Sequence, residues 1–257
     1  MEWFTTDDGK YRIESLSAAT FPGALTVIRE AFFQDESVCI GTEVNKNPVA
    51  GEELLELCAD AALDGVSLVA VAVETGDVAS VAFNKLQVAT SDTSEKSFFE
   101  IFAEERCTQP SSRALVEWMA EVDGRCNLFE KCNVDCSLEI MFLATHREHR
   151  YNKLGTLLCK TSIELGKKLK YGPVSCINIQ DLGPKYSHFI PREPVSNVPK
   201  ICQALWTAEP TQKIGKELGF TVALRISFAD FYYNGKAYSE RLGREVFSEA
   251  AFIRIDN

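Results

Sequence analysis

The spacing of apolar residues along the chain changes from a continuous run to a helical period near residue 153. Leu138 to Ala144 is a mostly apolar run with β-branched and aromatic members, long enough for a buried strand. Thr145 to Lys153 is polar and basic. From Leu154 to about Lys170, apolar residues recur near helical spacing and lysines occupy the other face. The pattern therefore predicts a strand, a basic loop and an amphipathic helix in succession.

The N-terminal half has the pattern of alternating strands and helices. Two β-rich runs flank Thr75-Gly76-Asp77, which is a hairpin signal. Phe21, Ala24 and Ile28 fall on one helical face, and Pro22 suits a first helical turn. The predicted elements are strands at 10–15, 66–74 and 78–88, helices at 17–33, 47–63 and 110–122, a helix ending near Arg106, and an irregular segment or short helix at 124–135.

The C-terminal part begins with a long excursion. Gly172 to Lys200 contains five prolines and few apolar pairs, and a loop of this length is usually functional or mobile. Its Tyr186, His188 and Phe189 could shape a pocket or fix the excursion to the surface. The remaining predicted elements are strands at 201–207, 221–231 and 245–255, and a helix at 210–218 that Gly219 ends. About seven strands with helices between them, without a repeat or linker, predict one α+β sheet in a single domain over residues 1–257.

Charge and composition narrow the classes of partner. The 257 residues are 46% hydrophobic, which is enough for a substantial core, and the net charge is −10. Negative charge disfavours nucleic acid and anionic membranes and mildly favours cationic small molecules. The acidic start lacks a secretory signal, and no apolar run approaches the length of a membrane span. We therefore expect a cytoplasmic protein, acting as a monomer, with no nucleic-acid or membrane partner.

The nine cysteines are scattered along the chain. For a chain without a signal peptide, reduced thiols are the expected state. Cys126, Cys132 and Cys136 lie close together, but their spacings are not those of a zinc knuckle or ribbon. His146 and His149 are better explained as part of the basic loop. We expect no metal.

The basic loop has the features of an anion site. The first turn of a helix has unpartnered N–H groups, and its dipole favours anions, so the loop before such a helix can wrap a phosphate. Residues Arg150 to Gly155 resemble the pyrophosphate-binding signature Q/R-x-x-G-x-G/A of the GNAT superfamily of acetyl-CoA-dependent N-acetyltransferases. Arg150 and Gly155 match, and Lys153 stands where the middle glycine is usual. If that position needs a positive φ, the lysine is strained by about 1 kcal/mol; if not, it adds a cation beside the phosphates.

Two other blocks extend this resemblance. Phe32-Phe33-Gln34-Asp35-Glu36 places two acids directly after paired aromatics, where they oppose the dipole of a helix end. Residues 204–220 end in the K-x-L-G-F pattern of the superfamily's fourth conserved segment. In this order, the three blocks resemble the insect-type arylalkylamine N-acetyltransferases over about Arg12 to Ile255. The excursion is longer than that family suggests.

The resemblance implies a fold and a cosubstrate. The implied fold is the GNAT acyl-CoA N-acyltransferase fold, a single mixed, strongly twisted seven-stranded sheet with helices on both faces and splayed central strands. Acetyl-CoA would lie between the splayed strands, and a backbone N–H would stabilise the oxyanion. The implied coenzyme-binding residues are Phe142, Leu143, Ala144, Arg150, Tyr151, Asn152, Lys153, Leu154, Gly155 and Thr156.

The resemblance also implies catalytic roles. A protonated amine has no lone pair, so a general base must remove its proton. The family's base matches Glu36, with Asp35 beside it attracting the cation or facing solvent. The family's hydroxyl positions match Thr207 and Thr211, which could equally be ordinary strand and helix-start residues. The usual tyrosine acid is absent near Ile214 and Gly215, so the thiolate would leave unaided.

Three functions remain open. The first is acetyl transfer to a small primary amine, either an arylalkylamine or a polyamine-like cation. The second is a non-catalytic member that binds coenzyme or ligand, which Lys153 and the two threonines permit and Glu36 opposes. The third is acetyl transfer to a protein N-terminus or lysine, with the excursion covering or blocking a peptide groove.

Overall fold

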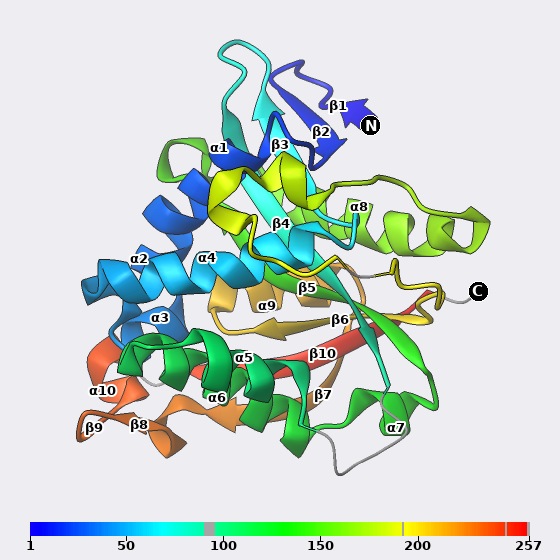
Figure 1. Ribbon diagram of the computed structural model, residues 1–257. Coiled ribbons are helices and arrows are strands. Elements are labelled where there is room, and N and C mark those ends of the chain that lie inside the picture. Colours follow the sequence, from blue (N-terminus) through cyan, green and yellow to red (C-terminus); the bar gives the residue numbers. More distant parts are fainter. Residues whose placement is uncertain (90–95, 192, 245, 256–257) are drawn as a thin grey trace.

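A mixed sheet of eight strands runs through the molecule (Figure 1). The structure is a computed structural model that describes residues 1–257 except 90–95, 192, 245 and 256–257. In spatial order the strands are β1 (Glu2–Thr5), β2 (Tyr11–Ser15), β3 (Leu68–Ala72), β4 (Val78–Val88), β5 (Cys136–Thr145), β6 (Ile201–Trp206), β10 (Phe247–Arg254) and β7 (Thr221–Ser227). All neighbours pair antiparallel except β5 and β6, which are parallel. The predicted α+β fold class is confirmed, with one strand more than the expected seven. The additional strand is β1, which pairs with β2 at the sheet edge.

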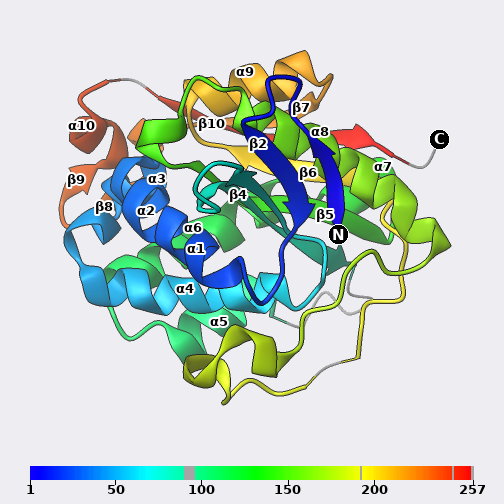
Figure 2. The same ribbon diagram turned by 90° about the horizontal axis from the view of Figure 1, so that it is seen from above.

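Helices cover both faces of this sheet. Figure 2 shows α1 (Phe21–Val27) and α4 (Pro48–Ala62) on one side and α8 (Leu154–Lys168) and α9 (Glu209–Glu217) on the other. α6 (Pro110–Arg125) lies on the α4 side, and α5 (Phe98–Arg106) packs on it. The side chains between the layers form two separate buried clusters. Phe21, Phe83 and Phe142 belong to the α1 side, and Leu138, Leu158 and Leu165 belong to the α8 side.

The helix predicted for residues 17–33 begins at Phe21 and runs to Asp35 in three parts. A π-helical segment, η1 (Ile28–Phe32), separates α1 from the short α2 (Phe33–Asp35). The wider turn rotates the helix face, so Phe33 is buried as well as Phe21. Phe32 meets Phe142 of β5 edge to face, with ring centroids 5.1 Å apart. The paired aromatics therefore fix the end of this helix against the middle of the sheet.

Most other predicted elements occur within a few residues of their expected bounds, but two regions differ. The strand predicted for 221–231 ends at Ser227, where η7 (Phe228–Asp230) begins with the Ser227 hydroxyl accepting from the Ala229 N–H. The last strand begins at Phe247, and Glu245 lies outside the described residues. The polar connection between them forms β8 (Tyr232–Tyr233), β9 (Lys236–Ala237) and α10 (Tyr238–Leu242). Other short helices are α3 (Ser37–Gly41), η2 (Val44–Lys46), α7 (Leu128–Cys132), η3 (Arg147–His149), η4 (Leu169–Tyr171), η5 (Ile179–Leu182) and η6 (Pro184–Tyr186).

The excursion from 172 to 200 packs against the body of the protein. The Tyr186 ring is 2% exposed and lies edge-on to Phe21, with centroids 5.8 Å apart. Lys185 reaches Glu52 of α4 at 2.7 Å. Of the two roles open for its aromatic residues, the structure favours fixing the excursion to the α1–α4 surface.

Candidate active site

The parallel pairing of β5 and β6 stops halfway along the two strands. Ile140 and Ala204 are the last paired residues, and the strands diverge beyond them. A cavity of about 1030 Å³ opens at this divergence, lined by β5 from Glu139 to Thr145 and by the end of β6. On this side of β5, alternate backbone groups from Phe142 to Ala144 have no strand partner. The predicted splay is confirmed, and it exposes backbone N–H and C=O groups to the cavity.

A β-bulge at Met141 divides β5 into two halves. Phe83 and Asn84 of β4 are consecutive, but they pair with Phe142 and Ile140, so Met141 has no partner. The extra residue changes which face of the sheet each side chain occupies. Ile140 therefore packs in the α8-side cluster and Phe142 in the α1-side cluster. By the same alternation, Glu139 points to the α1 side, as Phe142 does.

The N-terminus of α8 forms one end of the cavity. Lys153, Gly155 and Thr156 line it, together with Arg150 and Tyr151 of the preceding loop. The first bond closing the helix runs from the Leu157 N–H to the Lys153 carbonyl at 3.0 Å. Within the described residues, no backbone N–H from 151 to 156 has a hydrogen-bond partner. This end of the cavity therefore presents a set of free amide donors at the positive end of a helix dipole.

Lys153 occupies the left-handed region that the usual glycine would take. Its φ is +56° and that of Tyr151 is +68°. The conformation is therefore required at this position, and the lysine adopts it while placing its side chain on the cavity wall. Both possibilities raised by the sequence hold together: the backbone is strained, and a cation is added beside the free amides.

Replacing Lys153 separates these two effects. We expect Lys153→Gly to be more stable than Lys153→Ala by about 1 kcal/mol, because only glycine enters the left-handed region without a Cβ clash. Both variants lose the cation equally. Urea denaturation of the two proteins measures the difference, and equal midpoints would show that the loop does not hold this conformation in solution.

Glu36 lies at the other end of the cavity, on the α1 side. It is the N-cap of α3, and its two carboxylate oxygens accept from the N–H groups of Val38 at 2.9 Å and Cys39 at 2.7 Å. These two N–H groups fix the orientation of the Glu36 carboxylate. Glu36 follows the C-terminus of α2, where an acid is unfavourable, because it caps the N-terminus of α3. The sequence pattern did not predict α3.

Asp35 faces the basic loop before α8 rather than open solvent. Its oxygens accept from Arg147 Nη2 and Arg150 Nη2, each at 2.5 Å. The Arg147 hydrogen bond first, and then Arg150, hold the pKa of this carboxyl below its usual range. Arg150 also donates to the Thr145 carbonyl at 3.3 Å. Asp35 therefore ties the segment carrying Glu36 to the loop before α8.

The remaining predicted site residues divide into two groups. Thr207 and Thr211 line the cavity, and the Thr211 hydroxyl donates to the Ala208 carbonyl at 2.8 Å. Asn152 does not line it, because its amide donates to the carbonyls of His149 and Arg150 and so shapes the loop. All other predicted residues are brought to one cavity: Glu36, Thr207, Thr211, Phe142, Leu143, Ala144, Arg150, Tyr151, Lys153, Leu154, Gly155 and Thr156.

The structure adds residues that sequence reasoning missed. Leu115, Trp118 and Met119 of α6 form an apolar wall near Glu36, and Glu139 of β5 joins the lining. The spacing of apolar residues in the sequence predicts the apolar face of α6. It does not predict that this face lines the cavity. None of the described residues between 172 and 200 lines the cavity, so the excursion neither covers nor blocks it.

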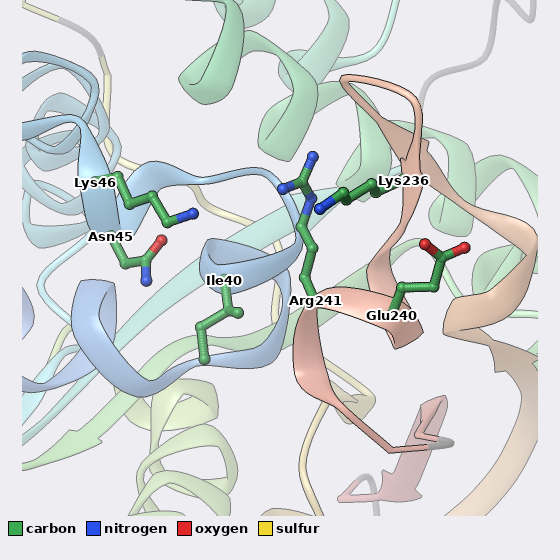
Figure 3. Close-up of a pocket in the computed structure, with 6 residues that line it drawn as sticks. All are labelled: Ile40, Asn45, Lys46, Lys236, Glu240 and Arg241. Atoms are coloured by element: carbon green, nitrogen blue, oxygen red, sulfur yellow. The ribbon is translucent and has the colours of Figure 1, made fainter.

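A smaller pocket of about 360 Å³ lies beside α3 (Figure 3). Asn45 and Lys46 of η2 face Lys236, Glu240 and Arg241 across it. Arg241 also lines the large cavity, and its Nη1 lies 2.8 Å from Glu43 Oε1. The Arg241 side chain therefore borders both spaces and connects α10 to Glu43, the residue before η2.

Within the described part of the chain, no group of three histidine, cysteine or acidic side chains is arranged to hold a metal ion. Among those same residues, no helix is both long and apolar enough to cross a membrane.

Several solved structures resemble this protein in fold. No family model and no curated protein matches the chain. Arylalkylamine N-acetyltransferase 2 from Aedes aegypti superposes with a TM-score of 0.72 at 20% identity, over 95% of this chain and 99% of that one. The Drosophila melanogaster polyamine N-acetyltransferase, which forms N-acetylagmatine, gives a TM-score of 0.70 at 11% identity over the same shares of the two chains. The C-terminal condensation domain of Ebony, bound to beta-alanyl-dopamine, gives 0.59 at 11%, again over 95% and 99%. These similarities show that the chain has the GNAT N-acyltransferase fold.

Proposed function

We propose that this protein transfers the acetyl group of acetyl-CoA to the nitrogen of a small primary amine. The observation that carries the proposal is that a single cavity joins the free amides of α8 to Glu36 through the gap between β5 and β6. Phosphates suit the amide end, and a cationic amine suits the carboxylate end. The neighbouring structures named for arylalkylamine and polyamine acetylation agree with this assignment.

The coenzyme half of the site would hold the diphosphate and the thioester. The N–H groups of 151–156 would bind the diphosphate, with Arg150 and Lys153 adding charge. The pantetheine arm would pair with the unpartnered edge of β5 from Phe142 to Ala144. A backbone N–H on that edge would then donate to the oxygen that becomes negative in the transition state.

The amine half would carry out the proton transfer. Glu36, directly or through a water, takes a proton from the ammonium group, and the freed lone pair attacks the thioester carbon. The C–N bond forms, and the nitrogen gives its second proton to water as the tetrahedral intermediate collapses. The C–S bond then breaks to release the CoA thiolate. With a thiol pKa near ~8.5 this group can leave without an acid, which agrees with Ile214 occupying the position where the family has tyrosine. Thr207 and Thr211 would position the amine or relay its proton.

The cellular setting we propose is the reducing cytoplasm. All nine cysteines lie in the described residues, and all are free thiols. We also propose that the protein acts as a monomer, which sedimentation in the presence and absence of acetyl-CoA would test.

The deciding experiment measures CoA thiol release from acetyl-CoA with a panel of primary amines and with peptides bearing free N-termini. Release with small amines supports the proposal. Release of CoA only with peptides would show that the protein acetylates other proteins instead. Acetyl-CoA binding without release on any acceptor would make this a non-catalytic coenzyme-binding protein.

The two arginines that hold Asp35 offer a matched pair. We expect Arg150→Ala to raise the Kd for CoA by about tenfold, because a half-exposed charge-assisted contact to phosphate is lost. Arg147 shares the Asp35 contact but does not line the cavity, so Arg147→Ala should change the Kd by less than about threefold. Calorimetric titration with CoA measures both values. Equal effects would mean that the arginines act through Asp35 alone.

A further inference from the structure

Glu139 is a buried carboxylate that faces the large cavity and forms no salt bridge with any described residue. The residue is 2% exposed and lines the cavity from β5. Gln87 Nε2 donates to one oxygen at 2.8 Å, and among the described residues the other oxygen has no hydrogen-bond partner. Buried carboxylates are normally paired with a cation or fully hydrogen-bonded. A ligand in the cavity could therefore supply the missing partner of this oxygen.

The cation nearest to Glu139 among the described residues is already bound to other carboxylates. Lys85 is its cross-strand neighbour, but the Lys85 ammonium lies 2.7 Å from Asp60 and 3.7 Å from Asp64. Asp123 of α6 is close enough that the Glu139 charge, after desolvation, raises the Asp123 pKa well above its usual range. Two carboxyl groups that share a site ionise one at a time. Burial also raises the pKa of Glu139, more than the hydrogen bond from Gln87 and the charge of Lys85 lower it. A cationic group that arrives from the cavity would favour the ionised form of this carboxyl.

A third acceptor lies beside the pair. Gln203 of β6 is the register partner of Glu139 across the parallel strands, so the two side chains point to the same face of the sheet. The Gln203 Oε1 atom is buried without a hydrogen-bond partner. A group that satisfies several oxygen acceptors at once must carry several N–H donors and a positive charge, as an ammonium or guanidinium does.

We propose that Glu139 forms a subsite for the second cationic group of the substrate, which makes the preferred substrate a linear diamine or aminoguanidine. This inference rests on the proposed function, because it takes Glu36 as the site of the reacting amine. Glu36 and Glu139 both line the cavity. Phe142, where the edge proposed for the thioester begins, and Glu139 pair with Phe83 and Lys85, which are two residues apart on β4. A separation of about 7 Å along the strand suits nitrogens separated by roughly four or five carbons.

The test compares two amines that differ only at the far end: cadaverine, a five-carbon diamine, and pentylamine. For the native protein we expect kcat/KM for cadaverine to exceed that for pentylamine by roughly 10- to 100-fold, the effect of a buried hydrogen bond to a charged group. Glu139→Gln should remove this preference by lowering the cadaverine value and leaving the pentylamine value within about threefold. Glu164→Gln, an acid on the exposed face of α8, is the control and should change neither.

Each result decides the proposal. Equal use of the two amines by the native protein, or an equal loss of both in Glu139→Gln, would overturn it. Equal use of cadaverine and 5-aminopentanol would also overturn it, because a neutral hydroxyl would then suffice. If no amine is acetylated, the proposed function fails, and calorimetric binding of cadaverine to the CoA-loaded protein still tests the subsite. Binding at least tenfold tighter to the native protein than to Glu139→Gln would support it, and equal binding would refute it.

Discussion

Replacing Glu36 by glutamine should lower kcat for amine acetylation by at least about 10²-fold, the usual contribution of a positioned general base. Glutamine is close to glutamate in shape, and its amide oxygen can still accept from one of the two α3 N–H groups that Glu36 binds. The variant should therefore lose only about 1 kcal/mol of unfolding free energy, the typical value of a helix cap. The loss of rate would then exceed anything that the loss of stability could cause.

The pH dependence of the variant distinguishes chemistry from distortion. Without a base, the reaction depends on the fraction of amine that is already free, which rises about tenfold per pH unit below an amine pKa near ~10. The Glu36→Gln rate should follow this slope between about pH 7 and 9, and the native enzyme should rise less steeply. Glu30→Gln, an exposed acid of η1 outside the cavity lining, serves as the control. A Glu36→Gln rate that stays flat with pH, or a kcat near the native value, would remove Glu36 from the mechanism.

Gly41→Ala should destabilise the protein by about 1–3 kcal/mol, the usual range for overpacking. Gly41 ends α3, and a Cβ there would lie 2.5 Å from Cγ and 3.0 Å from Cβ of Tyr238. These are the inner atoms of a buried side chain on α10, so rotation of the ring does not relieve the clash. Either α3 or α10 must move, and α3 carries the N–H groups that orient Glu36.

The comparison variant is Gly124→Ala. Gly124 lies in α6, where an added Cβ meets nothing within 4 Å. Alanine favours helix over glycine, so this change should stabilise the protein by about 0.5 kcal/mol. Thermal unfolding of both variants should therefore shift in opposite directions. A neutral Gly41→Ala variant would mean that α3 and α10 do not pack as described.

The sequence predicts the coenzyme half of the site better than the amine half. The strand, loop and helix around Lys153 are contiguous, so local periodicity and charge are enough to place them. The positive φ at Lys153 could not be predicted, because a lysine in the sequence does not indicate a left-handed conformation. The packing of Tyr186 on Phe21 also needed them, since it joins segments far apart in the chain.

The amine half depends on features without a local signature. Glu36 caps a helix of five residues, and glutamate is not among the preferred capping residues. Glu139 stands inside an apolar run, where alternation alone does not show which face it occupies. That face is set by the bulge at Met141, which appears only in the pairing of β5 with β4. Sequence reasoning therefore located the proposed base through resemblance and missed the second acid entirely.

The bulge at Met141 gives one strand two independently adjustable parts. The residues after it form the edge proposed for the coenzyme, and the residues before it form the inner wall of the proposed amine pocket. Mutations upstream could therefore alter acceptor choice during divergence while the shared donor remains bound in the same way. Substitutions at Glu139 and its neighbours would then change which amine is accepted without weakening the binding of the acetyl donor.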